Sequence, residues 1–362
     1  MDKTDPDITF DENGVCNHCK AYDNAIKKLP QTEEQKKKVL DKIINDIKEK
    51  GKDREYDCII GLSGGVDSSY VAYKVKEFGL RPLVVHFDSG WNSELAVNNI
   101  ENIVKKLNFD LYTVVVDWEE MRDLQLSFFK ASVQNCDDPQ DHSFIAALYK
   151  IANEHNIRYI ISGYNLATES VLPRSWANNS LDLKSLRSIH KEFGTLKLKR
   201  YPQIGMYKRS IYYNIIKKIE ILHILDYLPY NKEETKIFLK SELNWRDYGG
   251  KHYESKFTRF YQAYYLPTKF GFDKRKAHLS SLIVSGQISR EQALEELKEE
   301  IYPINQLQED REFVCKKLGI TEMEFEQIMA LPIKTYKDYP SNYNDITLRV
   351  IRIAGKILVS IK

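Results

Sequence analysis

Residues 56–73, YDCIIGLSGGVDSSYVAY, contain the side chains and backbone features best suited to binding phosphate. An apolar run at 58–62 leads into two consecutive glycines, Gly64 and Gly65, and then into a segment compatible with a helix. Because the glycines lack a Cβ, the backbone can approach an anion, and the first N–H groups of the helix point to the same place. Serine hydroxyls beside them can donate to phosphate oxygens. The spacing predicts a strand, a phosphate-binding turn and a helix N-terminus.

A GxxxxGK[ST] loop would need a lysine that this turn lacks. The sequence SGGVDSS at 63–69 instead resembles the PP-loop of the N-type ATP pyrophosphatases. The resemblance implies that AMP is transferred from ATP to a substrate oxygen, and that a nucleophile then displaces AMP. It also implies that pyrophosphate is held by Ser63, Gly64, Gly65, Asp67, Ser68 and Ser69. We expect Asp67 and Ser68 to act in catalysis and Asp67 to bind Mg²⁺. The alternative is that Asp67 serves only as an acid at a helix N-terminus.

The elements downstream alternate as a parallel, doubly wound sheet requires. We expect strands at 58–62, 82–88, 111–116 and 158–162, with helices at 95–107 and 143–155. The predicted fold is an α/β protein with a mostly parallel sheet and a helical C-terminal region. Three regions are expected: an N-terminal CxxC segment and helix at 1–50, an ATP-binding α/β domain at 51–235, and a mainly helical substrate-binding and C-terminal region at 236–362.

Shorter signals add detail outside the sheet. Residues 33–50 are rich in Lys and Glu and predict an exposed helix. Ser289 and Gln292 form a capping box ahead of an amphipathic segment at 291–301, and Gly319 separates two short helical patterns. The apolar run at 348–361 has the composition of a strand.

Polar residues follow the expected strands where each one ends. His86 and Asp88 end the strand at 82–88, and Gly163, Asn165 and Glu169 follow the strand at 158–162. Ligands of open α/β sheets bind at the carboxyl ends of the strands, so we expect these residues to surround one nucleotide. His86 and Asp88 would border the adenosine, Gly163 and Asn165 the phosphates, and Glu169 the reacting centre. For His86 the alternative is a structural polar residue.

The loop CDDPQDH at 136–142 gathers three carboxylates and a histidine before a helix. Asp141 is expected to cap that helix. A metal or substrate contact at the mouth of the site is the alternative.

A second dense region lies at 245–281, where cations alternate with aromatic residues. Cations and stacking surfaces together suit a nucleotide sugar, a phosphorylated sugar or RNA. An aromatic packing interface remains the alternative. The candidate substrate-binding residues here are Lys251, His252, Glu254, Lys269 and Arg275.

The order of four segments resembles the N-acetyl sugar amidotransferases of O-antigen and flagellar sugar biosynthesis: FDENGVCNHC, SGGVDSS, YGGKHYESKFTRF and FDKRKAHLSSLIVSGQISREQAL. The resemblance covers nearly the whole chain and implies the adenine nucleotide alpha hydrolase-like PP-loop fold. It implies a cytoplasmic enzyme that uses ATP and Mg²⁺ to convert the acetamido group of a nucleotide-linked sugar into an acetamidino group, releasing AMP and pyrophosphate. Lys251, His252, Glu254, Lys269 and Arg275 would then lie on the sugar side, with Lys251 also acting in catalysis.

The cysteines raise two further expectations. Members of this family often carry a second CxxC pair upstream, giving four thiolates for zinc. Here only Cys16 and Cys19 form such a pair, so Zn²⁺ either needs an upstream segment, recruits His18 or His252, or is absent. None of the five cysteines fits a glutaminase nucleophile. The resemblance therefore implies a separate glutaminase and an ammonia-channel subunit, with free ammonium as the fallback.

The composition fits a globular cytoplasmic protein: 362 residues, 42% hydrophobic, 29% charged and a formal net charge of +2. That charge does not by itself argue for nucleic acid or an anionic membrane, and no apolar run approaches a membrane span. Two rival functions remain open. One is a tRNA-modifying PP-loop ATPase that uses the cations at 197–209, and the other is a non-catalytic ATP-binding protein.

Overall fold

The structure is a computed structural model that describes residues 1–177, 179–250 and 253–342. Within these residues, five parallel strands form one sheet in the order β3-β2-β1-β4-β5. The strands are β1 Cys58–Gly61, β2 Pro82–Asp88, β3 Asp110–Val115, β4 Tyr159–Ile161 and β5 Glu220–Leu222. Four of them confirm the sequence prediction. The fifth, β5, was not predicted because three residues beside Lys217 and Lys218 are too few to show a strand period.

Helices and loops connect the strands within the described chain. The α-helices are α1 Asn17–Ile26, α2 Glu33–Gly51, α3 Val66–Glu77, α4 Glu94–Leu107, α5 Trp118–Lys130, α6 Asp138–Glu154, α7 Leu166–Glu169, α8 Leu183–Phe193, α9 Lys232–Leu243, α10 Lys256–Phe260, α11 Arg275–Val284, α12 Arg290–Glu296, α13 Ile304–Leu318 and α14 Glu322–Ala330. Short 3₁₀ and π segments are η1 Arg174–Trp176, η2 Lys208–Ile216, η3 Ile224–Tyr227, η4 Tyr261–Phe270 and η5 Tyr336–Asp338.

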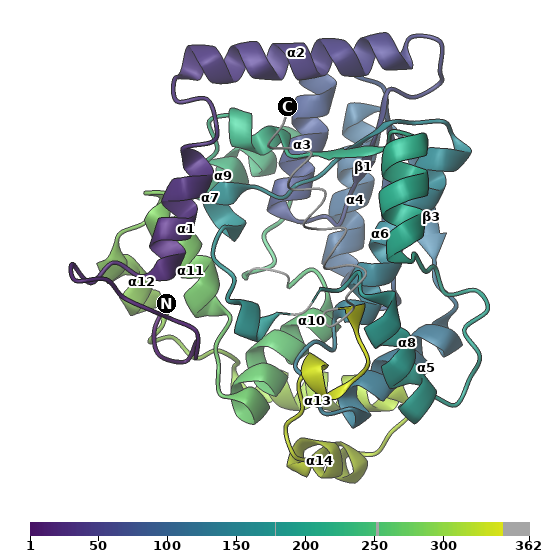
Figure 1. The fold of residues 1–362 in the computed structure, drawn as a ribbon, viewed down its shortest axis with the longest axis vertical. Helices are drawn as coiled ribbons and strands as arrows, with labels where there is room; N and C mark the ends of the chain where they lie inside the picture. Colours follow the sequence, from purple (N-terminus) through teal and green to yellow (C-terminus); the bar gives the residue numbers. More distant parts are fainter. Residues whose placement is uncertain (178, 251–252, 343–362) are drawn as a thin grey trace.

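Successive strand residues point to opposite faces of the sheet, and helices cover both faces. Ile60 of β1 packs in a core with residues of α2, α3, α4 and α9, whereas its neighbour Ile59 packs in a second core with α6 and η2. Figure 1 shows α2 lying across one end of the molecule and α14 at the other. This is the doubly wound architecture that the alternating pattern predicts.

β1 lies in the middle of the sheet and pairs with both β2 and β4. Cys58 is opposite Pro82 on one side and opposite Tyr159 on the other. The chain leaves β1 toward β2 and later returns to place β4 on its other side, so the direction of winding changes between β1 and β4. In open sheets this is where the crevice for a ligand forms.

A third core is helical and contains residues from distant parts of the sequence. Phe128 and Phe129 of α5 pack with Phe257 and Phe260 of α10 and with Phe325 of α14. The predicted boundary at 235–236 therefore does not divide two separately packed cores. Instead, Leu239 and Leu243 of α9 pack in the core with β1, and α10 packs in the core with α5.

Several local predictions are confirmed at helix ends. Ser289 and Gln292 form the predicted capping box on α12, and the predicted helix at 33–50 is α2. Thr32 and Gln35 form a capping box on α2 that was not predicted. Gly319 ends α13 with a φ of +74°, a left-handed conformation that favours glycine. The run at 348–361 lies outside the described residues. Among the residues that are described, no helix is both long and apolar enough to cross a membrane.

The prediction that Asp141 caps a helix is wrong. α6 begins at Asp138, with Asp137 as its N-cap, so Asp141 lies within the first turn. Pro139 near the start of the helix supplies the fixed φ that favours initiation there. The buried carboxyl of Asp138 accepts a hydrogen bond from Asn135 Nδ2, and burial raises its pKa to about 8. The acidic loop is therefore largely the first turn of a helix.

Candidate functional site at the carboxyl ends of β1, β2 and β4

The glycine turn after β1 requires glycine at residue 64 for two independent reasons. Gly64 has a φ of +81°, and a Cβ there would lie 2.7 Å from the carbonyl oxygen of Ala96 in α4. Gly65 is the N-cap of α3 and has no side chain to cover the helix N-terminus. The turn therefore packs against α4 and presents the first N–H groups of α3 at the carboxyl edge of the sheet.

The serines of the turn hydrogen-bond to its own backbone and to each other. Ser63 Oγ accepts the N–H of Gly65 at 3.2 Å, while Ser68 Oγ and Ser69 Oγ donate to the carbonyl of Gly65 at 3.2 and 2.6 Å. Ser63 Oγ and Ser68 Oγ are 3.3 Å apart. These hydrogen bonds within the turn restrict the conformations that it can adopt. Such preorganisation lowers the cost of ordering the loop around phosphate.

The turn after β4 meets the PP-loop directly. Asn165 Nδ2 donates to Asp67 Oδ1 at 3.2 Å, and Asn165 also caps α7 by accepting the N–H of Thr168 at 2.9 Å. A Cβ on Gly163 would lie 3.0 Å from the backbone nitrogen of Ser68, so only glycine leaves ordinary contact distances there. Gly163, Asn165 and Asp67, chosen separately from the sequence, are thus adjacent in the fold.

His86 and Asp88 at the end of β2 belong to a hydrogen-bonded network. His86 Nδ1 is 3.3 Å from the carbonyl oxygen of Leu62, and Nε2 is 3.3 Å from Asn92 Nδ2. A neutral ring that donates from Nδ1 and accepts at Nε2 satisfies both contacts. Burial lowers the pKa of His86, which favours that neutral form. Asn92 also donates to Asp88 Oδ1, so the network fixes the strand end beside the PP-loop.

Three aromatic residues that sequence reasoning missed also contact the PP-loop. The hydroxyl of Tyr230 donates to Asp67 Oδ1, and Trp245 Nε1 donates to the carbonyl of Gly64 at 2.8 Å. The hydroxyl of Tyr248 accepts the N–H of Val66 at 3.3 Å. They lie far from the loop in the sequence, so no local pattern links them to it. For Trp245 and Tyr248 the only signal was the density of aromatic residues from 245 onward, and Tyr230 had no such signal.

Glu254 lies beside the PP-loop. Its Oε1 would be 3.6 Å from a Cβ on Gly65. The backbone explains the placement, because Ser93 N–H donates to the carbonyl of Glu254 at 2.9 Å and Asn92 forms a bridge with Ser255. Residues 254–256 are thereby attached to the loop after β2. Glu169 ends α7 one turn beyond Asn165, and its assignment to the reacting centre stays a prediction.

The sugar-side role predicted for Lys269 is not supported. Its ammonium group donates to the carbonyls of Ile328, Met329 and Leu331 at 2.9, 2.9 and 2.8 Å. These carbonyls lie at the C-terminal end of α14, where the helix dipole favours a cation. Lys269 therefore holds the end of a helix in place.

The guanidinium group of Arg275 also contacts other parts of the protein. Its guanidinium pairs with Asp273 at 2.9 Å and donates to the carbonyl of Glu299 at 3.0 Å, beyond the end of α12. The predicted sugar-side role of Arg275 is thus not supported either. Lys251 and His252 lie outside the described residues, so their assignments stay predictions.

For many aromatic residues of the 245–281 region, packing is the correct alternative. Phe257, Phe260, Tyr261 and Tyr265 are buried in the helical core with α5 and α14. Tyr265 donates to the carbonyl of Val133 at 3.1 Å, which satisfies its hydroxyl. The aromatic density of the described residues therefore arises mainly from a core, whereas Trp245 and Tyr248 contact the PP-loop.

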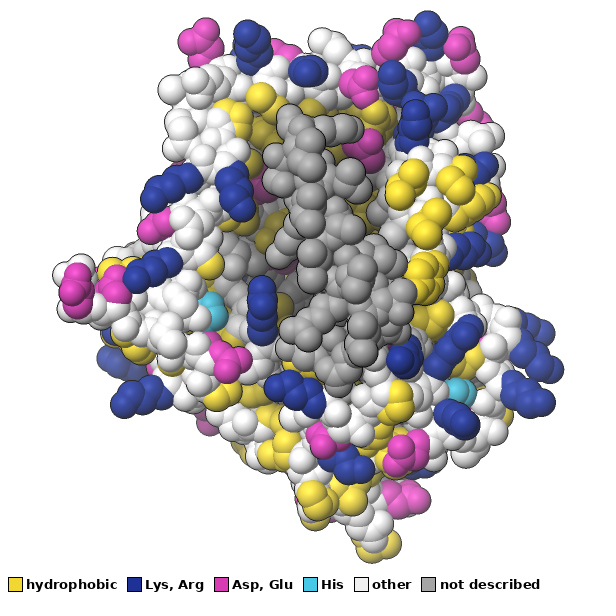
Figure 2. Space-filling model, viewed as in Figure 1, with side chains coloured by type: hydrophobic (Ala, Val, Ile, Leu, Met, Phe, Trp, Pro, Cys, Tyr) yellow, Lys and Arg dark blue, Asp and Glu magenta, His cyan; other side chains and the backbone are white. Residues whose placement is uncertain are grey.

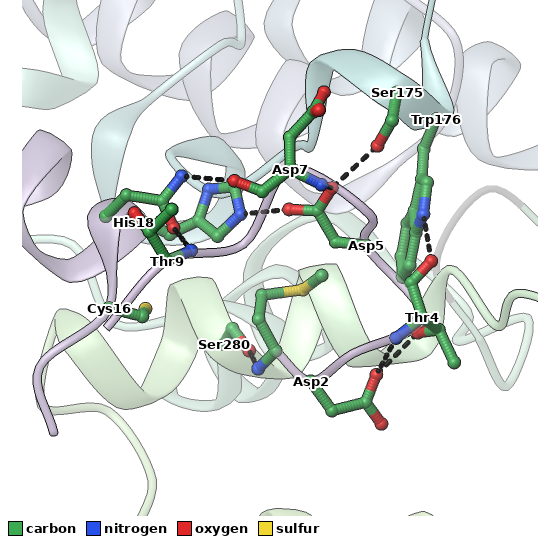
Figure 3. Close-up of polar contacts among 12 residues, drawn as sticks. Asp2, Thr4, Asp5, Asp7, Thr9, Cys16, His18, Ser175, Trp176 and Ser280 are labelled. Carbon is green, nitrogen blue, oxygen red and sulfur yellow. Dashed lines mark hydrogen bonds and ion pairs between the residues drawn. The ribbon is translucent and has the colours of Figure 1, made fainter.

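The possible zinc site at Cys16 and Cys19 is not supported. The two Sγ atoms are 3.4 Å apart at the N-terminus of α1. His18 does not join them, because its Nε2 binds the buried carboxylate of Asp5 at 2.7 Å, which also accepts from Ser175 Oγ (Figure 3). No group of three or more His, Cys, Asp or Glu within residues 1–177, 179–250 and 253–342 could hold a metal ion. His252 is outside those ranges.

The C-terminal part of the chain matches a known family model, described as "LPS biosynthesis protein WbpG-like, C-terminal domain", over residues 254–352. Residues 254–352 are similar to the WbpG-like C-terminal domain. The match supports the predicted family resemblance over these residues, and it begins at Glu254, which lies near the PP-loop. No curated protein matches the chain in sequence.

Three solved structures show partial likeness. NMN synthetase from Francisella tularensis is 17% identical over 51% of this chain and 71% of its own, with a TM-score of 0.30. The NH₃-dependent NAD synthetase from Campylobacter jejuni is 16% identical over 76% of this chain and 95% of its own, with a TM-score of 0.33. A predicted tRNA methyltransferase subunit from Methanocaldococcus jannaschii is 15% identical over 50% and 73%, with a TM-score of 0.25.

Proposed function

We propose that this protein is an ATP-dependent amidotransferase that converts the N-acetyl group of a nucleotide-linked sugar into an acetamidino group for surface polysaccharide or flagellin glycan biosynthesis. Two observations support the proposal together: an internally hydrogen-bonded PP-loop at the switch point of the sheet and a WbpG-like segment attached beside it. The observation that carries it is their proximity, since Glu254 Oε1 would lie 3.6 Å from a Cβ on Gly65.

The proposed reaction has two steps, adenylation of the amide oxygen and displacement of AMP by ammonia. The acetamido oxygen attacks the α-phosphorus of ATP, and the bond to pyrophosphate breaks. Ammonia then adds to the activated carbon, and AMP leaves with the former amide oxygen while protons are released. An amide oxygen is a poor leaving group, and ATP supplies the adenylyl group that makes it a good one.

On the PP-loop side, the proposal assigns roles to backbone N–H groups, serine hydroxyls and one carboxylate. The N–H groups at the start of α3 and the hydroxyls of Ser63, Ser68 and Ser69 would bind the departing pyrophosphate. Asp67, oriented by Asn165 and Tyr230, would hold Mg²⁺, which offsets the charge that develops on the phosphates. Lys251 and Glu169 are proposed to act at the amide.

The nitrogen donor is ammonia, which we propose is delivered by a separate glutaminase and a channel-forming subunit. Cys58, Cys136 and Cys315 are buried, and burial raises the pKa of each thiol, so none of the three is an activated nucleophile. Purified alone, the protein should therefore use ammonium.

The proposal is tested by incubating the purified protein with ATP, Mg²⁺ and a panel of UDP- and CMP-linked N-acetyl sugars. Ammonium should support AMP and pyrophosphate formation with at least one sugar, and the sugar product should be lighter by the difference between an oxygen atom and an NH group. Glutamine without a partner protein should give no product. AMP formation that needs tRNA but no sugar would instead establish the RNA-modifying rival, and ATP binding without turnover on any substrate would favour the non-catalytic one.

A further inference from the structure

Tyr248 places a hydroxyl group inside the phosphate cradle from outside the PP-loop motif. Its oxygen accepts the N–H of Val66, the first residue of α3, at 3.3 Å. The same oxygen would be 3.2 Å from a Cβ on Gly65, in the space that this glycine leaves open. A polar oxygen therefore already occupies the kind of position that a phosphate oxygen takes at a helix N-terminus.

The position of Tyr248 is fixed by its neighbours. Its ring packs edge-on against Trp245, with the ring centroids 5.6 Å apart, and Trp245 itself donates to the carbonyl of Gly64. Asn99 of α4 holds the same stretch, because its Oδ1 accepts the N–H of Arg246 at 2.8 Å and its Nδ2 donates to the carbonyl of Arg246 at 2.9 Å. The residues before Tyr248 are thus attached to both the PP-loop and α4.

The chemistry of the hydroxyl suits an anionic ligand. Burial, and next the nearby carboxylate of Glu254, raise the pKa of Tyr248 well above its ordinary value, so the phenol keeps its proton at neutral pH. A phenol that accepts one hydrogen bond can still donate one. Phosphate oxygens accept hydrogen bonds and cannot donate when fully ionised, so they are matched partners for this O–H.

We propose that Tyr248 is a phosphate-positioning residue, which donates its O–H to an oxygen of the pyrophosphate part of ATP at the PP-loop. This inference rests on the proposed function, because it requires ATP to bind at the loop. It extends the phosphate site from the 63–69 motif to a residue 182 positions away in the sequence. It also gives the stretch that precedes the WbpG-like segment a direct part in nucleotide binding.

The test is the Tyr248→Phe variant of the full chain, which removes one oxygen and keeps the ring against Trp245. Dissociation constants for ATP, pyrophosphate and AMP are measured by calorimetry. We expect ATP and pyrophosphate to bind about 10-fold or more weakly, because a hydrogen bond to a charged group contributes about 1.5–3 kcal/mol. Affinity for AMP, which lacks the pyrophosphate group, should be unchanged. Tyr248→His, which retains a ring donor, should restore part of the pyrophosphate affinity.

Tyr339→Phe is the matched control, because it removes a buried hydroxyl that donates to the carbonyl of Ala131 at 2.9 Å in the helical core. It should leave all three affinities at the wild-type values. Tighter binding of pyrophosphate by Tyr248→Phe would show that the hydroxyl only competes with the ligand and would overturn the proposal. A parallel loss of ATP and AMP affinity with a lowered Tm would also overturn it, in favour of a packing role.

The outcome separates this inference from the proposed function. If the wild-type protein binds neither ATP nor pyrophosphate, both fail. If it binds them and Tyr248→Phe binds them equally well, only the assignment of Tyr248 fails.

Discussion

Asp67 shows how a single carboxylate is oriented by side chains from two distant segments. Asn165 and Tyr230 both donate to its Oδ1, one from the turn after β4 and the other from the stretch before α9. Two donors to one oxygen restrict the rotation of the carboxylate. Asp67, the proposed Mg²⁺ ligand, is therefore oriented by its surroundings as well as by its place in the PP-loop.

The first prediction concerns Tyr230. Replacing it by Phe removes one of the two donors to Asp67, so we expect kcat for pyrophosphate release to fall about 10-fold, as removal of a hydrogen bond to a charged group predicts. The Mg²⁺ concentration that gives half-maximal rate should rise. Steady-state kinetics at several Mg²⁺ concentrations check this, with Tyr339→Phe as the control. If the variant keeps the wild-type kcat and Mg²⁺ dependence, the contact between Tyr230 and Asp67 has no part in Mg²⁺ binding.

The second prediction concerns Lys269, whose ammonium group donates to backbone carbonyls at the C-terminal end of α14. Lys269→Met keeps most of the apolar stem but removes the cation from the end of α14, so the free energy of unfolding should fall by about 1–2 kcal/mol. The KM for the sugar and for ATP should stay near wild type. Denaturant unfolding and steady-state kinetics measure the two effects. Unchanged stability together with a raised KM for the sugar would instead support the prediction that Lys269 binds the sugar.

The third prediction uses the buried carboxyl of Asp138. Its pKa rises from 3.8 to about 8 on folding, chiefly by burial and next by Asp141 and Asp137, while Asn135 and Lys274 act in the other direction. Between those two pH values the unfolded chain has released a proton that the folded chain retains. Stability from this group therefore falls as the pH rises through that window and is level above it.

Asp138→Asn removes the ionisation but keeps groups that can pair with Asn135. The Tm of the variant relative to wild type should therefore be higher at pH 8 than at pH 5. Scanning calorimetry at both pH values measures the difference, with the exposed Asp53→Asn variant as a control that should not change it. An equal difference at the two pH values would contradict a raised pKa at Asp138.

At the scale of the elements, the strands and turns of the nucleotide side could be predicted because their signals are local. A continuous apolar run predicted β1, and the glycines and polar residues after β1 and β4 predicted the turns that meet at Asp67 and Asn165. The start of α6 could not be predicted as well, because Asp138 is an acidic residue that the fold buries and thereby neutralises. The sequence gives no local sign of that burial.

The fourth prediction is at this scale, where the PP-loop packs against α4. Gly64→Ala places a Cβ 2.7 Å from the carbonyl oxygen of Ala96 and requires a left-handed φ, whereas Gly286→Ala requires a similar φ with nothing within 4 Å. Left-handed strain alone costs about 1–2 kcal/mol. Both variants should therefore lose some stability, but only Gly64→Ala should lose ATP and pyrophosphate binding. Calorimetric titration tests this, and normal ATP affinity in Gly64→Ala would show that the loop does not bind the nucleotide.

At the scale of the whole molecule, contacts between distant segments determine which residues of the 245–281 region reach the site. The same basic and aromatic composition serves a helical core at Phe257 and Tyr265, a helix end at Lys269, and the PP-loop at Tyr248 and Glu254. Composition alone could not separate these roles, because each depends on a partner more than a hundred residues away or on another element. The sequence therefore predicted which residues meet around Asp67 better than it predicted which residues of the 245–281 region lie near the PP-loop.

The charge distribution bears on the RNA-modifying rival. Figure 2 shows Lys and Arg side chains interspersed with Asp and Glu on the face it draws, and the chain has a formal net charge of +2. Among the cations that such a rival would use, Arg200 pairs with Asp117 at 3.1 Å. A mixed surface provides little of the long-range attraction that dominates nucleic-acid binding. The charges on this face therefore do not favour the RNA-modifying rival.

In the proposed reaction, the oxygen of the acetamido group is transferred to the AMP that is released. To test this, the protein is incubated with ATP, Mg²⁺, ammonium and a nucleotide sugar that carries the ¹⁸O isotope in its acetamido group. The AMP that forms is then analysed by mass spectrometry. We predict that AMP gains the heavy oxygen and that the sugar product has lost it. Unlabelled AMP, or ADP and phosphate in place of AMP and pyrophosphate, would contradict the proposed function.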